Sequence, residues 1–315
     1  MAEIPAPHAG GTADLGGLAV SRIGFGAMQL ERLHGDRDAA IALLHRAVEL
    51  GVNHVDTAQF YGDGFVNGVI RDAYRDATGG SGGSDSADGS GVIVVSKVGA
   101  TPDTGGRVPL RLAQRPDELR ASVEDNLKSL GLDRIPVVNL RRADSGPGLR
   151  AEGDQVVDLD DQLAVMTALR DEGKIGAIGL SAVSLDTLRR ALPAGVVCVQ
   201  NSYSLVTRED EELLALCVAE NIAWVPFFPL GGAFPGLPKV TDAPEVHAAA
   251  EALGVTPAQI GLAWLLHHTP NTVLIPGTAD PAHLAANVAA GAIRLDPATL
   301  AALDAVKSRT GDFEL

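Results

Sequence analysis

The chain has 315 residues, of which 46% are hydrophobic, and a formal net charge of −15. This length suits one large α/β domain or two ordinary ones, with ample material for a core. The acidic balance and the lack of a basic run argue against nucleic acid or an anionic membrane as partner. No apolar run approaches the roughly 18–20 residues of a membrane helix, and we expect no secretion signal in the first residues.

Two composition features bear on compartment and domain organisation. Cys198 and Cys217 form no CxxC pair, so we expect a reduced, cytoplasmic protein. The glycine- and serine-rich stretch from Thr78 to Gly91 has the composition of a flexible linker. It interrupts an otherwise regular alternation of elements. We therefore expect a single domain over 1–315 with a disordered surface insertion at 78–91.

Short runs rich in Val and Ile alternate with longer segments of helical period along the chain. The predicted strands are 22–29, 52–58, 92–100, 134–140, 175–182, 195–204, 222–232 and 271–278. The predicted helices are 37–51, 65–77, 116–131, 159–174, 184–193, 208–221, the pair 244–254 and 256–269, and 281–291. About eight strand–helix units predict an α/β fold of the (β/α)8 TIM barrel type. The alternative, a doubly wound sheet, usually carries a G-x-G-x-x-G loop, which "GFGAMQ" does not match.

Polar residues end several of these predicted strands, and in such a barrel the chemistry lies at the carboxyl ends of the strands. They are Asp56, Lys97, Asn139, Arg141, Ser181, Gln200, Asn201 and Thr278, together with Gly277. Any one of them could merely cap the next helix. Their occurrence together at one rim favours a functional site.

Asp56, Lys97 and Tyr61 form the most informative combination. Adjacent barrel strands bring the carboxylate and the ammonium within reach of each other, and Tyr61 follows Asp56 in the next loop. An ammonium beside a tyrosine favours loss of the phenolic proton. Such a tyrosine can give a proton to a carbonyl oxygen or take one from an alcohol.

These residues resemble a motif of the aldo-keto reductase superfamily, which reads "DTAQFYG" here and is followed by the lysine of "VVSKVG". The resemblance runs from "GFGAMQ" to "ANVAAG". It implies that Tyr61 is the proton donor, with Asp56 and Lys97, and that a nicotinamide passes a hydride to an aldehyde or ketone. Arg141 stands where the family commonly has a histidine. A guanidinium can still donate to a carbonyl oxygen; the alternative is a salt bridge to Asp144 or another rim carboxylate.

The resemblance also implies a set of cofactor-binding residues. They are Gly26, Ala27, Met28, Asp56, Ser181, Gln200, Phe227, Pro229, Leu230, Gly231, Gly277, Thr278, His283 and Asn287. Ala182 replaces the asparagine of the family's Ser-Asn pair, and both Phe227 and its neighbour Phe228 could instead be core residues. Glycine and histidine replace the usual lysine and arginine at Gly277 and His283. We therefore expect NADPH, with NADH possible.

Four segments, "NLR", "CVQNSYSL", "PFFPLGG" and "IPGT…HL…N", are most similar to a bacterial branch of pyridoxal reductases. The expected function is NADPH-dependent reduction of a small-molecule aldehyde or ketone, with pyridoxal as a lead. The alternative from another class is a nucleotide-bound regulatory or sensor subunit with little turnover. No metal site is expected because no HExxH motif is present, and a sugar hydrolase would leave Tyr61 and Lys97 unexplained. The sequence gives no oligomeric state.

Overall fold

The computed structural model describes residues 8–74, 91–103, 105, 110–146, 149–232 and 236–309. The insertion predicted from Thr78 lies outside the described residues, apart from Gly91.

A parallel sheet of seven strands forms the centre of the molecule, in the order β11-β10-β9-β8-β5-β4-β3. The strands are β3 (Phe25–Gly26), β4 (His54–Asp56), β5 (Ile93–Val98), β8 (Ile135–Arg141), β9 (Ile175–Ser181), β10 (Val196–Gln200) and β11 (Ala223–Trp224). All six residues of β5 are buried. Burial on both faces explains why these strands appear in the sequence as continuous apolar runs and not as alternating ones.

The segment at residues 272–274 links the two edges of this sheet. Isolated parallel bridges join Trp224 to Thr272 and Ile23 to Leu274. The Leu274 amide donates to the Arg22 carbonyl (2.8 Å), and the Gly24 amide donates to the Leu274 carbonyl (2.7 Å). The predicted strand 271–278 is therefore present only as bridges in the described chain. One reason is that Pro276 has no amide hydrogen to extend the pairing.

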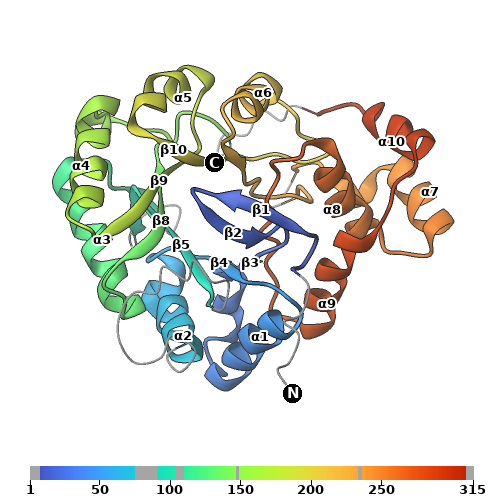
Figure 1. Cartoon of the computed structure of the whole chain (residues 1–315), viewed down its shortest axis with the longest axis horizontal. Helices are drawn as coiled ribbons and strands as arrows, with labels where there is room; N and C mark the ends of the chain where they lie inside the picture. Colours follow the sequence, from blue (N-terminus) through green and yellow to red (C-terminus); the bar gives the residue numbers. More distant parts are fainter. Residues whose placement is uncertain are drawn as a thin grey trace.

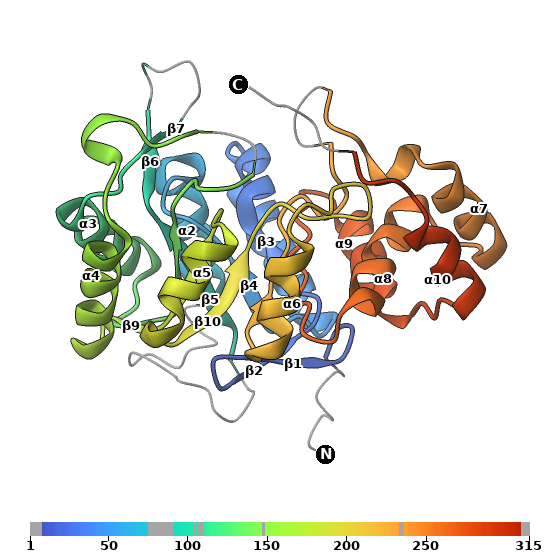
Figure 2. The same cartoon turned by 90° about the horizontal axis from the view of Figure 1, so that it is seen from above.

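Helices surround the sheet (Figure 1). They are α1 (Arg37–Glu49), α2 (Phe65–Tyr74), α3 (Pro116–Leu130), α4 (Leu159–Asp171), α5 (Leu185–Ala191), α6 (Glu211–Ala219), α8 (Pro257–His268) and α9 (Pro281–Ala289). Two further helices, α7 (Pro244–Leu253) and α10 (Pro297–Asp304), lie outside this ring (Figures 1 and 2). The sequence interpretation missed α10. The 3₁₀ helices are η1 (Ala27–Leu33), η2 (Tyr61–Gly64), η3 (Gly153–Gln155), η4 (Leu192–Ala194), η5 (Val240–Asp242) and η6 (Ala290–Ala292).

Side-chain caps explain where several of these helices begin. Asp36 accepts a hydrogen bond from the Ala39 amide at the start of α1, and Thr256 forms a capping box with Gln259 at the start of α8. Gly131 ends α3 in the left-handed conformation, with φ at 67°.

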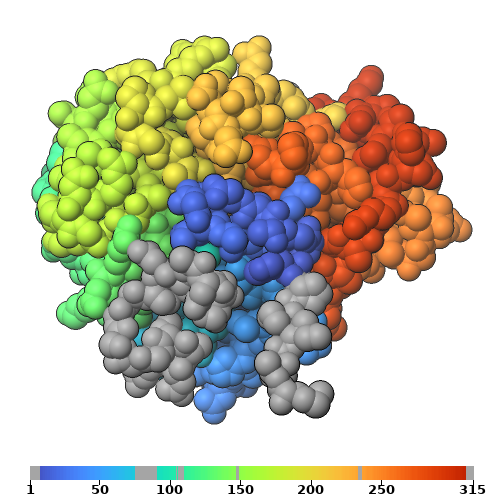
Figure 3. All heavy atoms as spheres, in the orientation of Figure 1, coloured from blue at the N-terminus to red at the C-terminus, as the bar shows by residue number. Residues whose placement is uncertain are grey.

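Two antiparallel hairpins lie on opposite sides of the sheet (Figure 2). They consist of β1 (Thr12–Leu15) with β2 (Leu18–Ser21), and β6 (Ala100–Pro102) with β7 (Leu110–Leu112). Leu15 and Val20 of the first hairpin pack on inward-facing strand residues such as Val95 and Val137. The first hairpin thus covers the amino ends of the strands, in the middle of the face shown in Figure 3. The second hairpin follows the carboxyl end of β5.

Within the described ranges, no single helix is long and apolar enough to cross a membrane. The bent pair formed by α7 and α8 passes that test together, by length and composition only.

Candidate active site

A buried ion pair joins the carboxyl ends of β4 and β5. Asp56 ends β4, and its strand register places it opposite Val95, two residues before Lys97 on the same face of β5. The Lys97 ammonium donates to the Asp56 carboxylate and to the Thr57 carbonyl oxygen, the latter at 2.9 Å. The two residues are only 3% and 6% exposed. The pair is therefore shielded from bulk water.

The ammonium of Lys97 stays charged despite its burial. Burial by itself lowers the pKa of Lys97, but the negative charge of Asp56 and the oxygen of Tyr61 together raise it above its ordinary value. The structure thus places a fixed positive charge beside a tyrosine.

Tyr61 begins η2, just after the end of β4. Its amide donates to the Ala58 carbonyl, and Lys97 Nζ lies 5.2 Å from the centroid of its ring. The backbone then turns through Gly62 and Asp63, both with positive φ. Glu31 anchors this turn by accepting a hydrogen bond from the Gly62 amide at 2.7 Å. Asp56, Tyr61 and Lys97 are therefore in one place, although they come from different elements.

Gln200, at the end of β10, also reaches this pair. Its Nε2 donates to Asp56 Oδ2 at 2.6 Å. Its Oε1 is buried and has no hydrogen-bond partner among the described residues. A primary carboxamide can donate to this oxygen, so the chemistry of Gln200 fits a nicotinamide. Ser181 ends the neighbouring strand β9 and is also buried.

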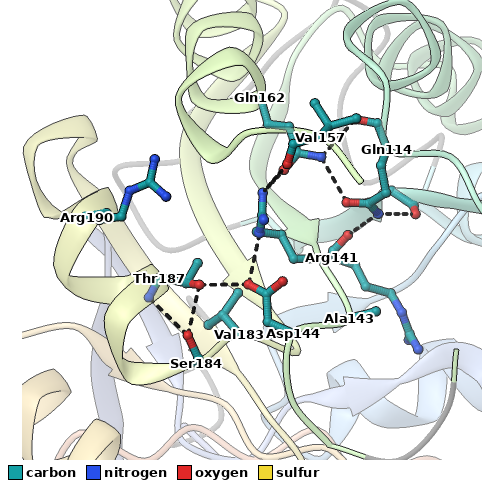
Figure 4. A network of polar contacts seen from close by, with 12 residues as sticks. Gln114, Arg141, Ala143, Asp144, Val157, Gln162, Val183, Ser184, Thr187 and Arg190 are labelled. Atoms are coloured by element: carbon teal, nitrogen blue, oxygen red, sulfur yellow. Dashed lines mark hydrogen bonds and ion pairs between the residues drawn. The ribbon is translucent and has the colours of Figure 1, made fainter. Parts of the chain in front are cut away.

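Arg141 is the last residue of β8, opposite Ser181 in the strand register. Burial lowers the pKa of Arg141, and Tyr61 opposes that shift. The alternative was a salt bridge from Arg141 to Asp144 or another rim carboxylate; Arg141 forms no ion pair among the described residues, and Asp144 pairs with Arg142 at 2.9 Å. Figure 4 shows the Arg141 side chain pointing away from the network that contains Asp144.

Ala182 follows Ser181 and adopts a left-handed conformation with φ at 53°. Asparagine adopts this region more readily than alanine. The alanine at position 182 is therefore less favourable in this left-handed conformation than the asparagine that the family commonly has there.

Two glycines allow a close approach of backbone segments beside the site. A Cβ atom on Gly26 would lie 2.4 Å from the Ile275 carbonyl oxygen, and one on Gly277 would lie 2.6 Å from the Gly26 carbonyl oxygen. Neither position can take a side chain without a backbone shift. Two further residues predicted to bind the cofactor follow Gly26: Ala27 is buried, and Met28 is 39% exposed.

The segment after β11 carries the predicted aromatic and glycine residues. The rings of Phe227 and Phe228 are perpendicular, with centroids 5.0 Å apart, and both side chains are only partly buried. They therefore do not lie within the core. Gly231 has φ at 67°, and Leu230 packs against the core; Pro229, which precedes Leu230, is partly buried.

The start of α9 contains a carboxylate that the sequence interpretation did not weigh. Thr278 is buried, and its hydroxyl accepts a hydrogen bond from the Asp280 amide at 3.0 Å. Asp280 caps α9 by accepting from the amides of Ala282 (2.7 Å) and His283 (3.2 Å). The His283 side chain is exposed and that of Asn287 is partly buried. The carboxylate lies beside the residues predicted to meet a 2′-phosphate.

Buried amides behind the strands support the site, and sequence reasoning missed them. Thr57 donates its hydroxyl to Asn67 Oδ1 at 2.8 Å, and Ser96 donates to Asn126 Oδ1 at 2.6 Å. The two asparagines are linked at 3.2 Å. Thr57 and Ser96 adjoin Asp56 and Lys97 in sequence. The sequence signal that could have revealed these amides is an asparagine on the apolar face of each of the predicted helices 65–77 and 116–131.

In the part of the chain that the structure describes, no group of three or more His, Cys, Asp or Glu residues could hold a metal ion.

Comparisons with known proteins identify the family of this chain. The model of the aldo/keto reductase family matches residues 22–308. The chain therefore belongs to this family and is an oxidoreductase.

The chain is 38% identical over 304 residues to pyridoxine 4-dehydrogenase of Escherichia coli, covering 94% of this chain and 98% of that protein. It is 32% identical over 306 residues to an uncharacterized oxidoreductase of Schizosaccharomyces pombe, covering 93% and 89%. Among solved structures, it is similar to an aldo/keto reductase from Klebsiella pneumoniae in complex with NADP and acetate. That likeness has a TM-score of 0.72, 27% identity and coverage of 93% and 94%.

Proposed function

We propose that this protein reduces pyridoxal, or a related aldehyde, to the alcohol with NADPH. The observation that carries the proposal is the buried Asp56–Lys97 pair beside Tyr61, with Gln200 completing the group. The relative named pyridoxine 4-dehydrogenase supports the substrate class. The family member solved with NADP supports the cofactor.

The balanced reaction is pyridoxal, NADPH and a proton giving pyridoxine and NADP⁺. The bound nicotinamide supplies a hydride to the carbonyl carbon. Tyr61 transfers its phenolic proton to the carbonyl oxygen, and the Lys97 ammonium stabilises the phenolate that remains. Asp56 holds Lys97 in place and keeps it charged. Arg141 donates a hydrogen bond to the carbonyl oxygen as negative charge develops there.

Several residues are proposed to hold the cofactor. Gln200 Oε1 would accept a hydrogen bond from the nicotinamide carboxamide, and Phe227 would pack against the nicotinamide ring. Gly26 and Gly277 let two backbone segments of the proposed cofactor site meet closely. The remaining residues that the family resemblance assigns to the cofactor are Ala27, Met28, Asp56, Ser181, Pro229, Leu230, Gly231, Thr278, His283 and Asn287.

We also infer a closed (β/α)8 barrel, with residues 271–276 as the eighth strand. The isolated bridges on both sides of this segment support that inference. A closed barrel would place all of the proposed catalytic residues around one mouth.

The decisive experiment is NADPH oxidation by the purified protein with pyridoxal, with Tyr61→Phe and Tyr74→Phe as a matched pair of variants. Tyr74 is buried and its hydroxyl donates to the Leu44 carbonyl, so its loss controls for removing one phenol. We expect turnover on the order of 1 s⁻¹ or more, a fall of about 100-fold or more in Tyr61→Phe, and little change in Tyr74→Phe. Near-normal turnover in Tyr61→Phe would refute the role of Tyr61. No turnover of any aldehyde would favour a sensor subunit.

A further inference from the structure

The side chain of Arg141 is partly buried and has no ion-pair partner among the described residues. Inward-facing Val137 precedes it by four positions in β8, so Arg141 belongs to the inner face of the strand. Its Nε is buried and has no hydrogen-bond partner in the described ranges. A buried charge of this kind is costly unless an anion or other acceptors reach it.

The two carboxylates nearest to Arg141 in sequence and register are already engaged. Asp144 accepts hydrogen bonds from Arg142 at 2.9 Å and from the Thr187 hydroxyl at 2.7 Å. Asp56 accepts from Lys97 and Gln200. Neither carboxylate pairs with Arg141; their ion pairs among the described residues are with Arg142 and Lys97.

Hydrogen bonds from side chains fix the backbone carbonyl group of Arg141, whereas its Nε has no partner among the described residues. Gln114 Nε2 donates to the carbonyl oxygens of Arg141 (2.7 Å) and Gly99 (2.6 Å). Gln162 Nε2 in turn donates to both oxygens of Gln114, at 2.8 and 2.9 Å. These contacts join the strand ends that carry Lys97 and Arg141 (Figure 4). The network therefore fixes the position of Arg141 without neutralising its charge.

Two cations lie on the inner face at this end of the strands. Lys97 is paired with Asp56, whereas Arg141 has no carboxylate partner among the described residues, although the whole chain has a net charge of −15. Attraction for an anion is therefore a local property of the site and opposes the field of the whole protein.

We propose that Arg141 binds an acidic oxygen next to the reacting carbonyl group. The preferred substrates would then be carbonyl compounds that carry an anionic oxygen beside the carbonyl, as in ortho-hydroxyaryl aldehydes and 2-oxo acids. The planar guanidinium presents paired N–H groups that match two oxygens side by side. One oxygen is the carbonyl and the other is its acidic neighbour. This inference rests on the proposed function and narrows its substrate class; pyridoxal, with a hydroxyl beside its aldehyde, belongs to that class.

The test compares 2-hydroxybenzaldehyde with 4-hydroxybenzaldehyde, at a pH at which both phenols are ionised. The two isomers have the same charge and differ in whether the oxygen adjoins the aldehyde. We expect kcat/KM to favour the 2-isomer by about tenfold or more, which is within the strength of a hydrogen bond to a charged group. Arg141→Gln should bring this ratio close to one. Arg141→Lys keeps the positive charge but lacks the paired N–H groups of the guanidinium, so it should give an intermediate ratio.

Arg111→Gln is the matched control. Arg111 lies in the hairpin at the same end of the strands, is about half exposed and pairs with Glu118, so its loss removes the same charge from the surface. It should leave the ratio unchanged. An isomer ratio near one in the wild-type protein, or a ratio that Arg141→Gln leaves unchanged, would overturn the inference.

Binding separates this inference from the proposed function. Calorimetry measures the affinity of the protein, with and without NADPH, for 2-hydroxybenzyl alcohol and 4-hydroxybenzyl alcohol. Tighter binding of the 2-isomer, abolished in Arg141→Gln, supports the inference even if no aldehyde is reduced. Reduction of both aldehydes at equal rates, with equal binding of both alcohols, would leave the proposed function intact and refute the inference.

Discussion

Replacing Asp56 by asparagine tests the buried ion pair directly. The change keeps the size of the side chain and removes the charge that pairs with Lys97. The Lys97 ammonium keeps its hydrogen bond to the Thr57 carbonyl oxygen. Breaking a buried pair on one side costs about 3–5 kcal/mol. Because the amide oxygen can still accept one hydrogen bond, we expect a loss of about 3 kcal/mol in the free energy of unfolding.

The pH dependence of this loss follows from the pKa of Lys97. In the wild-type protein that pKa is raised, so the contribution of the pair is fully present below the ordinary lysine value and is lost only as the pH rises through the folded value. In Asp56→Asn, burial remains and the opposing charge is gone, so the pKa of Lys97 should fall below its ordinary value. The folded variant then binds fewer protons than the unfolded chain. Its stability should rise with pH by up to about 1.4 kcal/mol per unit.

The assay is urea unfolding of both proteins at pH 7 and pH 9, with Asp158→Asn as the control. Asp158 is an exposed cap that pairs with Arg190, and asparagine also caps helices, so the control should lose no more than about 1 kcal/mol. We expect the deficit of Asp56→Asn to shrink between pH 7 and pH 9. A deficit below about 1 kcal/mol, or one that does not change with pH, would refute the reasoning.

Three further predictions concern the cofactor residues and the support behind the site. Asp280→Ser keeps a helix cap but removes a carboxylate, so the ratio of NADH to NADPH dissociation constants should rise about three- to tenfold; an unchanged ratio would contradict this. Ala182→Asn should leave the melting temperature equal or higher, since asparagine suits the left-handed backbone, and should tighten cofactor binding; a lower melting temperature would count against it. Asn126→Leu should cost about 1–3 kcal/mol in urea unfolding by leaving Ser96 and Asn67 short of a partner, and a neutral result would exclude that role.

The regular parts of the fold were predictable because each strand and helix repeats one local pattern. Buried apolar runs identified β5, β8, β9 and β10, and helical periodicity identified α1 and α8. The predicted strands at 22–29 and 222–232 are much shorter in the structure, as β3 and β11. Their second halves turn into the loops and the 3₁₀ helix that shape the site, and apolar composition alone does not reveal such a turn.

The candidate site was predictable only as a list of strand-end residues. Register places Asp56 and Lys97 together, and parallel pairing makes this foreseeable for adjacent strands. The hydrogen bond from Gln200 to Asp56 spans 144 positions in the chain, and the pattern of neither strand implies it. The amide network of Gln114 and Gln162 was missed for a similar reason, because its partners are carbonyl oxygens, which every residue has.

The contact between the two edges of the sheet makes the proposed cofactor site depend on a segment that is synthesised long after Asp56 and Lys97. The bridge from Ile23 to Leu274 joins segments separated by most of the chain. Loop-closure entropy makes such distant pairings slow to form, and domains begin to fold while synthesis continues. A nascent chain that has not yet emerged beyond residue 274 can form the Asp56–Lys97 pair but lacks one side of the Gly26 backbone contact. The proposed cofactor site is therefore completed only after residues 274–277 have been synthesised.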